Sequence, residues 1–496
     1  MDFVQNFPCF SIVMSMFASI FSSALNGKHA KWLNTIVLCL ISIMSGVLLI
    51  YLIGTGQSYV YMMGRFPAPW GNEIRAGILE AGMALFFCII MLLSLFGGRT
   101  HIEDEVDPEK INLYYIMINL LLSSLLALVY TNDLFTAYVF VEINTISACG
   151  LIMIRQNGRT IEAATRYMIM SLLGSGLLLM GLCMLYDMTG HLLMSNIKAS
   201  IATIVAEGTY TIPLLVTIGI ISVGLAIKSA LYPFHTWLPD AYGYSTVSSA
   251  AILSSLVSKG YIFLLIKIFY RVIGFDIICN SHVINILFIF GIAGMIMGSL
   301  NAIKENDIRR MIAFSSVAQI GYIYMGFGLG TEAGMVASIF HIFSHAATKS
   351  LLFIAAIGLT DVSGKKRQFI HLTGAGYRNK IAGFAFTIGS LSMVGIPMFS
   401  GFVSKLLFAQ AAVQNNIKML PTLIALAIST ILNAIYFMKT VIRIYTPVES
   451  EFKGISFKEC KVYGITLICF IILNFILGMY SQPIVDLIQS GINMFA

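Results

Sequence analysis

Charged side chains are scarce in this chain of 496 residues. Asp, Glu, Lys and Arg together make up 11% of it, whereas a soluble domain is usually about a quarter charged. Hydrophobic residues make up 58%, and the mean hydropathy is +0.87. This composition excludes a water-soluble enzyme and predicts a polytopic membrane protein.

Paired cysteines and basic clusters are also missing. The eight cysteines are scattered without any C-x-x-C spacing, so we expect buried apolar thiols and no iron–sulfur or zinc site. No cluster of Lys and Arg is interleaved with aromatic residues over a soluble unit, which argues against nucleic-acid binding. We therefore expect no cofactor, and no redox centre or hydrolytic site, in this chain.

Long apolar runs fill the sequence and predict an all-α fold of about fourteen membrane helices. The expected spans are 8–25, 33–53, 77–97, 111–130, 134–153, 161–187, 211–231, 246–271, 280–302, 308–330, 331–359, 381–412, 420–445 and 461–480. Loops after odd-numbered helices carry nineteen Lys and Arg residues, and the other loops carry five. By the positive-inside rule, both termini should face away from the cytoplasm.

The seventh and twelfth predicted helices are interrupted. The seventh breaks at Tyr232-Pro233 just after Lys228, and the twelfth carries Lys405 just after Gly395, Pro397 and Gly401. Because they lie five helices apart, the two broken helices run in opposite senses, as in transporters built from inverted repeats. The predicted organisation is three N-terminal helices (1–110), two inverted five-helix repeats (111–271 and 280–445), and a C-terminal helix with a short amphipathic tail (446–496).

Ionisable residues inside apolar helices are the candidate functional groups. A lysine at a helix centre costs roughly 2.5 to 3.5 kcal/mol on insertion scales, so a chain that keeps one usually uses it. The deep set is Glu142, Lys228, Lys259, Lys349 and Lys405. Lys267 and Lys439 lie near predicted helix ends, where we expect them to snorkel to the membrane surface.

Two histidines extend this set. His341, His345 and Lys349 recur at every fourth position, so they line one helical face over about 12 Å. Such a stripe could pass a proton in short hops. The alternatives are a packing face with satisfied imidazoles, or a metal site, although a zinc protease of the H-E-x-x-H type would need Glu where this chain has Ile342.

Glu142 and Lys228 suggest a switch. A unit-charge pair at 4 Å in an effective dielectric near 20 interacts by about 4 kcal/mol. A charge crossing the membrane gains about 2.3 kcal/mol per 100 mV, so making or breaking one pair could decide where a proton rests. A static buried pair is the alternative.

Two further features lie outside the deep set. His235 and Asp240, which follow the break in the seventh helix, are the candidate access groups. The charged loop 99–110 is either a partner contact or a solvated turn.

Six stretches combine these residues with specific neighbours: GRFPAPWGNEIRA (64–76), DLFTAYVFVEI (133–143), AIKSALYPFHTWLPDA (226–241), ENDIRRMIAFSSVAQIGY (305–322), HIFSHAATKSLLF (341–353) and GIPMFSGFVSK (395–405). In these stretches the chain resembles the antiporter-like subunits shared by Mrp-type multisubunit cation/proton antiporters, the complex I membrane arm and membrane-bound hydrogenases. The Mrp D subunit is the most similar.

The resemblance implies a role for each residue of the deep set. Glu142 looks like the family's fifth-helix glutamate, and Lys228 like the seventh-helix lysine that pairs with it. Lys259 matches the eighth-helix relay, Lys405 matches the terminal lysine of the twelfth helix, and the eleventh-helix relay is matched by His341, His345 and Lys349. Two positions depart from the family pattern: Leu406 follows Lys405 where an acidic residue is common, and Ala76-Gly77, with Glu80 nearby, replaces an Asp-Gly pair.

The resemblance also implies a function and partners. We expect a subunit that moves protons, with Na⁺ in exchange in an Mrp-type complex, beside other antiporter-like and small membrane subunits in a bacterial or archaeal inner membrane. In a redox-driven complex, iron–sulfur or other redox centres would belong to partner subunits. The competing interpretations are a noncatalytic scaffold, for which neutralising Lys228 or Lys405 would be harmless, and a stand-alone transporter with a solute cavity.

Overall fold

The computed structural model describes residues 3–66, 71–448, 454–455, 457 and 459–495. Residues 67–70 of the GRFPAPW stretch lie outside this part. Within it, thirteen helical segments are long and apolar enough to cross a membrane, and two shorter apolar helices, α18 and α19, together make the predicted broken twelfth helix. The predicted all-α polytopic fold is therefore confirmed.

Most spans are single helices. They are α1 (Phe7–Ala24), α2 (Gly27–Thr55), α3 (Ile78–Gly97), α5 (Ile111–Tyr130), α6 (Leu134–Met153), α7 (Gly158–Thr189), α14 (Val283–Lys304), α15 (Ile308–Gly328), α16 (Glu332–Asp361), α20 (Asn416–Ile444) and α21 (Lys461–Met479). The eighth span consists of α11 (Val247–Ile252), a π-helical turn (Leu253–Val257), α12 (Ser258–Lys267) and a second π-helical turn (Ile268–Ile273).

The two predicted breaks are present. Helix α9 (Thr211–Ser229) ends where Ala230 takes a left-handed conformation, and the chain resumes as a 3-10 turn (Phe234–Trp237) and α10 (Leu238–Tyr244). Helix α18 (Lys380–Val394) ends at Gly395, whose φ of 92° favours glycine, and α19 (Ser400–Val413) follows. A Cβ on Gly395 would lie 2.9 Å from Cδ of Lys405, so this glycine also makes room for the lysine.

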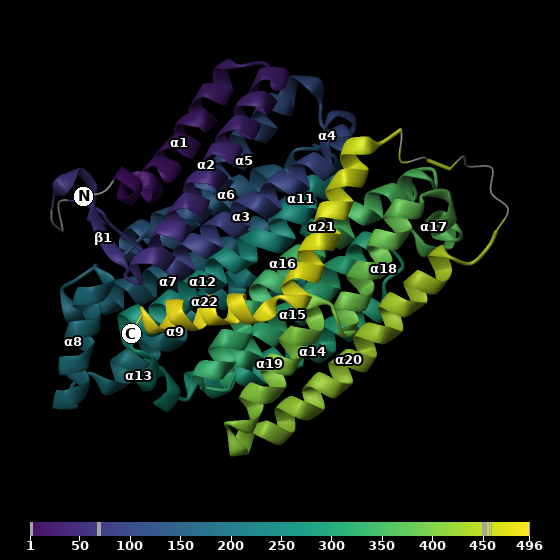
Figure 1. Ribbon diagram of the computed structural model, residues 1–496. Helices are drawn as coiled ribbons and strands as arrows, with labels where there is room; N and C mark the ends of the chain where they lie inside the picture. The colour runs from purple at the N-terminus through teal and green to yellow at the C-terminus, as the bar shows by residue number, and fades with distance from the viewer. Residues whose placement is uncertain (1–2, 67–70, 449–453, 456, 458, 496) are drawn as a thin grey trace.

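The core is built around α16. This helix is buried along its whole apolar length, as is the eighth span, and it packs against α15, α18, α19 and α21 (Figure 1). In contrast, α1, α2, α7 and α20 lie at the periphery and expose apolar side chains such as Ile43 and Ile50 of α2. The ionisable residues of α16 are therefore far from lipid.

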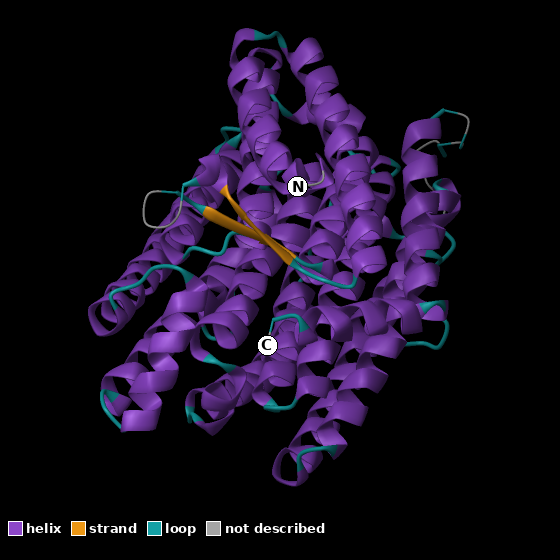
Figure 2. Cartoon of the chain, turned by 60° about the vertical axis from the view of Figure 1, so that its left-hand side comes forward, coloured by secondary structure: helices purple, strands orange, loops and turns teal. Residues whose placement is uncertain are grey.

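Several elements were not foreseen. Strand β1 (Tyr59–Met62) pairs antiparallel with β2 (Glu73–Ala76), with Tyr59 opposite Ala76 (Figure 2). Short helices α4 (Arg99–Glu105), α8 (Met194–Glu207), α13 (Phe275–Asn280) and α17 (Ala375–Arg378) occupy connections, and 3-10 turns cover Phe3–Asn6, Met63–Arg65, Pro108–Lys110 and Phe369–Leu372.

The C-terminal tail is an amphipathic helix, α22 (Ser481–Asn493), which lies across α3 and α16 (Figure 1). Just after it, the carbonyl of Met494 accepts a hydrogen bond from Arg75 of β2. The end of the chain is thereby tied to its first hairpin. The division into two inverted repeats stays a prediction.

Glycines set the closest helix crossing, between α14 and α15. A Cβ on Gly298 would lie 2.6 Å from the backbone nitrogen of Ala318, which real side chains do not tolerate. We expect Gly298→Ala to cost about 1 to 3 kcal/mol by overpacking and to lower the midpoint of thermal unfolding. Gly219→Ala is the matched control because no atom lies within 4 Å of its added Cβ. Equal midpoints for the two variants would contradict this account of the crossing.

Candidate functional site

Glu142 and Lys228 meet between α6 and α9. Lys228 is buried in the last turn of α9; its Nζ lies 4.0 Å from Oε1 of Glu142 and donates to Oγ1 of Thr145 at 2.7 Å. The Nζ also lies 5.4 Å from the ring centroid of Tyr261. The Glu142 side chain is 25% exposed, and its buried Oε1 makes no hydrogen bond within the described part of the chain. The pair is close but loosely held, as a separable pair would be.

Lys259 lies just past the first π-helical turn of the eighth span. Its buried Nζ folds back and donates to the carbonyl oxygen of Ser254, inside that turn. A π-helical turn is wider than an α-helical one, and such turns are frequent at functional sites. The irregular turn thus presents a carbonyl oxygen to a cation that has no carboxylate beside it in the described residues.

A chain of neutral groups leads from Lys259 to Lys349. The Ser254 hydroxyl lies 3.1 Å from that of Ser316 on α15, and Ser316 donates to the Ile312 carbonyl at 3.2 Å. The same carbonyl accepts a hydrogen bond from Nζ of Lys349 at 3.0 Å. Two predicted lysines, one from each half of the chain, are thereby joined through groups that carry no charge.

Lys349 has a second partner on α15, the hydroxyl of Ser315. Neither Ser315 nor Ser316 was singled out from the sequence. Serine is common in membrane helices and often bonds its own backbone, so only the spacing of the Ser315-Ser316 pair within the 305–322 stretch could have drawn attention to them.

The rings of His341 and His345 lie parallel, with centroids 5.9 Å apart and an interplanar angle of 1°. Nδ1 of His341 lies 2.6 Å from the hydroxyl of Ser404, the residue before Lys405. Both ring nitrogens of His345 and Nε2 of His341 are buried and make no hydrogen bond to the described residues. Both interpretations of this stripe, a proton path and a packing face, therefore stay predictions.

Among the described residues, no three His, Cys, Asp or Glu side chains are grouped so that they could hold a metal ion. The free ring nitrogens of His341 and His345 are instead positions where a proton can bind.

Lys405 caps the broken twelfth helix. Its Nζ donates to the carbonyls of Val394, at 2.6 Å, and Met393, at 3.4 Å, which are the last residues of α18. It also donates to Oγ1 of Thr430 at 2.9 Å. The C-terminus of a helix carries partial negative charge and unpaired carbonyls, so the break creates a site for a cation.

The two candidate access groups, His235 and Asp240, lie apart from the row of buried residues formed by Glu142, the four lysines and the two histidines described above. His235 is buried and stacked on Tyr232, with ring centroids 5.2 Å apart, and its Nδ1 has no hydrogen-bond partner among the described residues. Asp240 forms ion pairs with Arg166, at 2.9 Å, and with Arg310. No hydrogen bond in the described part of the chain joins either group to the lysines of the row.

A polar cavity of about 380 Å³ opens above the eighth span, beside Val247 at its first turn. Its walls include Glu105, Arg155, Arg309, Asp361 and Arg367. Part of the charged loop 99–110 therefore lines this cavity, and its role as a partner contact or a solvated turn stays a prediction.

Serine hydroxyl groups lie between this cavity and the buried lysines. Ser245 and Ser248, on either side of Val247, have buried hydroxyls without a partner among the described residues. About two turns further along, the Ser255 hydroxyl lies 2.7 Å from that of Ser350, the neighbour of Lys349. The first two turns of the eighth span thus carry serines between the cavity and Lys349.

The prediction for Lys267 was wrong. Its Nζ is fully buried and donates to the carbonyls of Leu128, at 3.2 Å, Val129, at 2.9 Å, and Thr131 at the end of α5. It cannot snorkel, because α5 covers the end of the eighth span. Lys439, in contrast, is exposed as expected.

Arg271, at the end of the predicted span 246–271, was counted among the five basic residues of the other loops, and this assignment was wrong. It is buried in the second π-helical turn, where it donates to Asn132 and lies 3.9 Å from Glu80 of α3. Asn132 in turn donates to Glu73 of β2. The isolated carboxylate Glu80 in an otherwise apolar helix was the signal for this network, and Arg271 is its counter-charge.

Residues 131–432 match the family described as NADH:quinone oxidoreductase/Mrp antiporter, TM. The NADH-quinone oxidoreductase subunit N of Desulforudis audaxviator is 30% identical over 393 residues, 79% of this chain and 76% of that protein. A Staphylococcus aureus protein named antiporter subunit mnhD2 is 28% identical over 464 residues, 93% of this chain and 89% of that protein. The chain belongs to the NADH:quinone oxidoreductase/Mrp antiporter transmembrane family, and the predicted resemblance is confirmed.

A solved structure of another protein has a similar fold. A chain of the archaeal membrane-bound sulfane sulfur reductase, a respiratory membrane complex, superposes with a TM-score of 0.86 at 24% identity. The superposition covers 99% of this chain and 97% of that one, so the likeness extends over the whole fold.

The neutral bridge can be tested at Ser316. Ser316→Ala removes the hydroxyl between Ser254 and the Ile312 carbonyl, and the loss of a hydrogen bond worth about 1 kcal/mol should slow proton translocation roughly fivefold. The measurement is proton uptake by proteoliposomes that contain the purified protein with its native partner subunits. Ser15→Ala is the control, because that buried hydroxyl bonds only its own helix. Equal slowing in both variants would count against the bridge.

Proposed function

We propose that this chain is the proton-translocating subunit of a multisubunit membrane complex. Protons would move along a buried row formed by Glu142, Lys228, Lys259, Lys349, His345, His341 and Lys405. The observation that carries the proposal is the network of hydrogen bonds around Ser254, Ser316 and the Ile312 carbonyl, because it holds the ammonium groups of Lys259 and Lys349, one from each predicted repeat, in one row. Membership of a family named for quinone oxidoreductases and Mrp antiporters supports it.

The loose Glu142–Lys228 pair is the switch in this scheme. With the pair closed, the carboxylate stabilises the ammonium by about 4 kcal/mol at 4 Å, for an effective dielectric near 20. When the carboxylate turns away or takes up a proton, that stabilisation is lost, and the proton on Lys228 passes toward Lys259. Repulsion by the arriving charge then moves a proton from Lys349 through the histidines to Lys405, which releases it.

Access to the row is from the face with the basic loops. The polar cavity beside Val247 and the serines below it support this route, and Asp240 and His235 form a second candidate on the same face. Since the cavity is lined by Arg155, Arg309 and Arg367, the positive-inside rule makes this face cytoplasmic and both termini non-cytoplasmic. The membrane would be a bacterial or archaeal inner membrane.

Two kinds of complex suit such a subunit. In Mrp-type cation/proton antiport, the partners are other antiporter-like and small membrane subunits, and Na⁺ moves against protons. In a hydrogenase-like or complex I-like assembly, partner subunits with redox centres drive the same row. The similarity to an antiporter subunit favours the first kind, and the similarity to an oxidoreductase subunit favours the second.

Neutralising the switch tests translocation. Glu142→Gln keeps the shape but removes the charge, so we expect proton translocation by the reconstituted complex to fall about tenfold or more while the yield of assembled complex stays unchanged. Glu142→Asp should recover part of the rate. Glu162→Gln, which removes an exposed carboxylate on α7, is the matched control. Full activity of Glu142→Gln would favour the scaffold interpretation.

Purification of the protein from its native membrane in mild detergent identifies the complex to which it belongs. A cluster-free set of small hydrophobic subunits, with Na⁺-dependent proton release in proteoliposomes, is the outcome expected for an antiporter. Co-purifying subunits with iron–sulfur clusters, identified by their absorption and mass spectra, would instead establish a redox-driven pump.

A further inference from the structure

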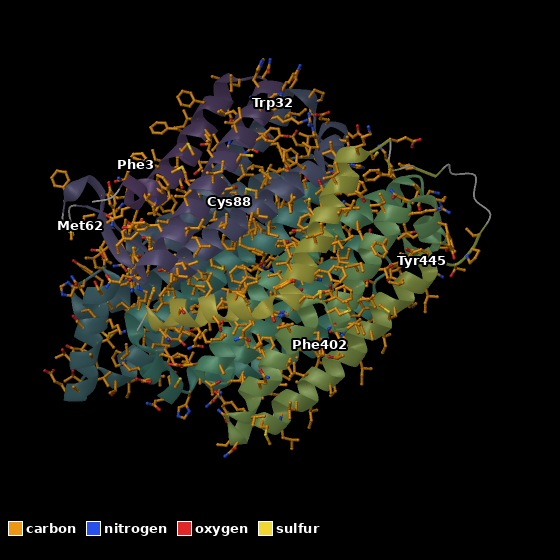
Figure 3. The ribbon with its side chains drawn as sticks, viewed as in Figure 1. Phe3, Trp32, Met62, Cys88, Phe402 and Tyr445 are labelled. Carbon is orange, nitrogen blue, oxygen red and sulfur yellow. The ribbon has the colours of Figure 1, made fainter. Side chains whose placement is uncertain are left out.

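A second cavity lies at the edge of the fold, between α2, α3 and α5, and has a volume of about 210 Å³. Lys31 and Trp32 of α2 and Arg99, just after α3, line its mouth. Leu38 and Leu95 line its interior. Trp32 lies at the α4 end of the N-terminal helices, at the surface of the molecule (Figure 3). The cavity is distant from the proposed proton row and plays no part in it.

The mouth of this cavity carries excess positive charge. Arg99 makes no hydrogen bond or ion pair with the described residues. Lys31 forms an ion pair with Glu103 of α4, whose side chain is 55% exposed. Two cations thus face one solvated carboxylate, and the guanidinium of Arg99 is free for an anionic ligand.

Polarity changes with depth. Lys31 and Leu38 lie seven residues apart on α2, which is about 10 Å along the helix axis. Arg99 and Leu92 have the same spacing on the α3 side. Trp32 is 56% exposed at the level of the cations, the position that tryptophan favours at a membrane surface. Asn34 and Thr35 line the cavity between these two levels. A ligand of this cavity must therefore be anionic at one end, polar over the next turn of α2 and apolar at about 10 Å from the cations.

This layout selects among three kinds of occupant. A free inorganic anion would leave the apolar interior unfilled. A membrane helix from a partner would need a groove along the hydrocarbon thickness of about 30 Å, whereas this cavity runs for about a third of that distance. A glycerophospholipid has an anionic phosphate, then a polar glycerol diester and then acyl chains, so it matches the cations, the polar turn at Asn34 and Thr35, and the apolar interior.

We propose that this cavity is a binding site for one acidic phospholipid. The phosphate lies between Arg99 and Lys31, and the first part of an acyl chain packs on Leu38 and Leu95. Basic pockets between helices on the cytoplasmic side are typical sites for acidic lipid headgroups. The Lys and Arg distribution places this end of α2 and α3 in that leaflet.

The test counts lipids on the purified protein by native mass spectrometry, after exchange into detergent with added phosphatidylglycerol or phosphatidylcholine. We expect one phosphatidylglycerol to be retained in preference to phosphatidylcholine. Arg99→Gln should weaken its retention about fivefold, as should Lys31→Gln, and the double variant should lose the preference. Lys28→Gln is the control, because Lys28 is an exposed cation on the same turn of α2 that does not line the cavity.

Three outcomes would overturn the proposal. One is equal retention of the two lipids, and another is unchanged retention in Arg99→Gln and Lys31→Gln. The third is protection against thermal unfolding by glycerol 3-phosphate that equals protection by phosphatidylglycerol, since this would identify a plain anion site. Arg99→Lys, which keeps the charge, should retain the lipid and so separates loss of binding from misfolding.

Discussion

The structure depends on how it accommodates ammonium groups away from water. Lys259, Lys267, Lys349 and Lys405 each donate to main-chain carbonyl oxygens, and these carbonyls lie in a π-helical turn, at helix ends or on a neighbouring helix. Lys228 differs, because its described partners are a hydroxyl and a carboxylate. Fixed carbonyl dipoles hold a cation in place, whereas a carboxylate on a side chain can move or be neutralised.

Irregular helices are therefore part of the site. The break after Val394 and the turn at Leu253–Val257 each present oxygen atoms that a regular α-helix would leave paired within itself. In a membrane such backbone groups are stable only beside protein or water. The Leu253–Val257 turn is buried, and so are Met393 and Val394, whose carbonyls bind Lys405, whereas Ile396 and Met398 just after the break are exposed. The carbonyl oxygens that these irregular segments leave unpaired take the place of water around the lysine ammonium groups.

Hydropathy was sufficient to predict the spans, and proline and glycine were sufficient to predict the two breaks. The ionisable groups were visible because charge is rare in apolar helices. The roles of Lys267 and Arg271 were not visible, since whether a residue near a helix end reaches water depends on which helices cover that end. The bridging serines were also missed. A serine hydroxyl carries no charge, so it does not stand out in an apolar helix, and its partners lie on another helix.

The hydrogen bond from Arg75 to Met494 joins residues 419 positions apart in the sequence. Membrane helices enter the bilayer in order as the chain is synthesised, so the hairpin that carries Arg75 is complete long before its partner exists. Arg75 is therefore solvated by water or lipid headgroups until α22 has been made. The hairpin reaches its final hydrogen bonding only when α22 has packed on α3 and α16, so the order of synthesis delays the completion of this early element.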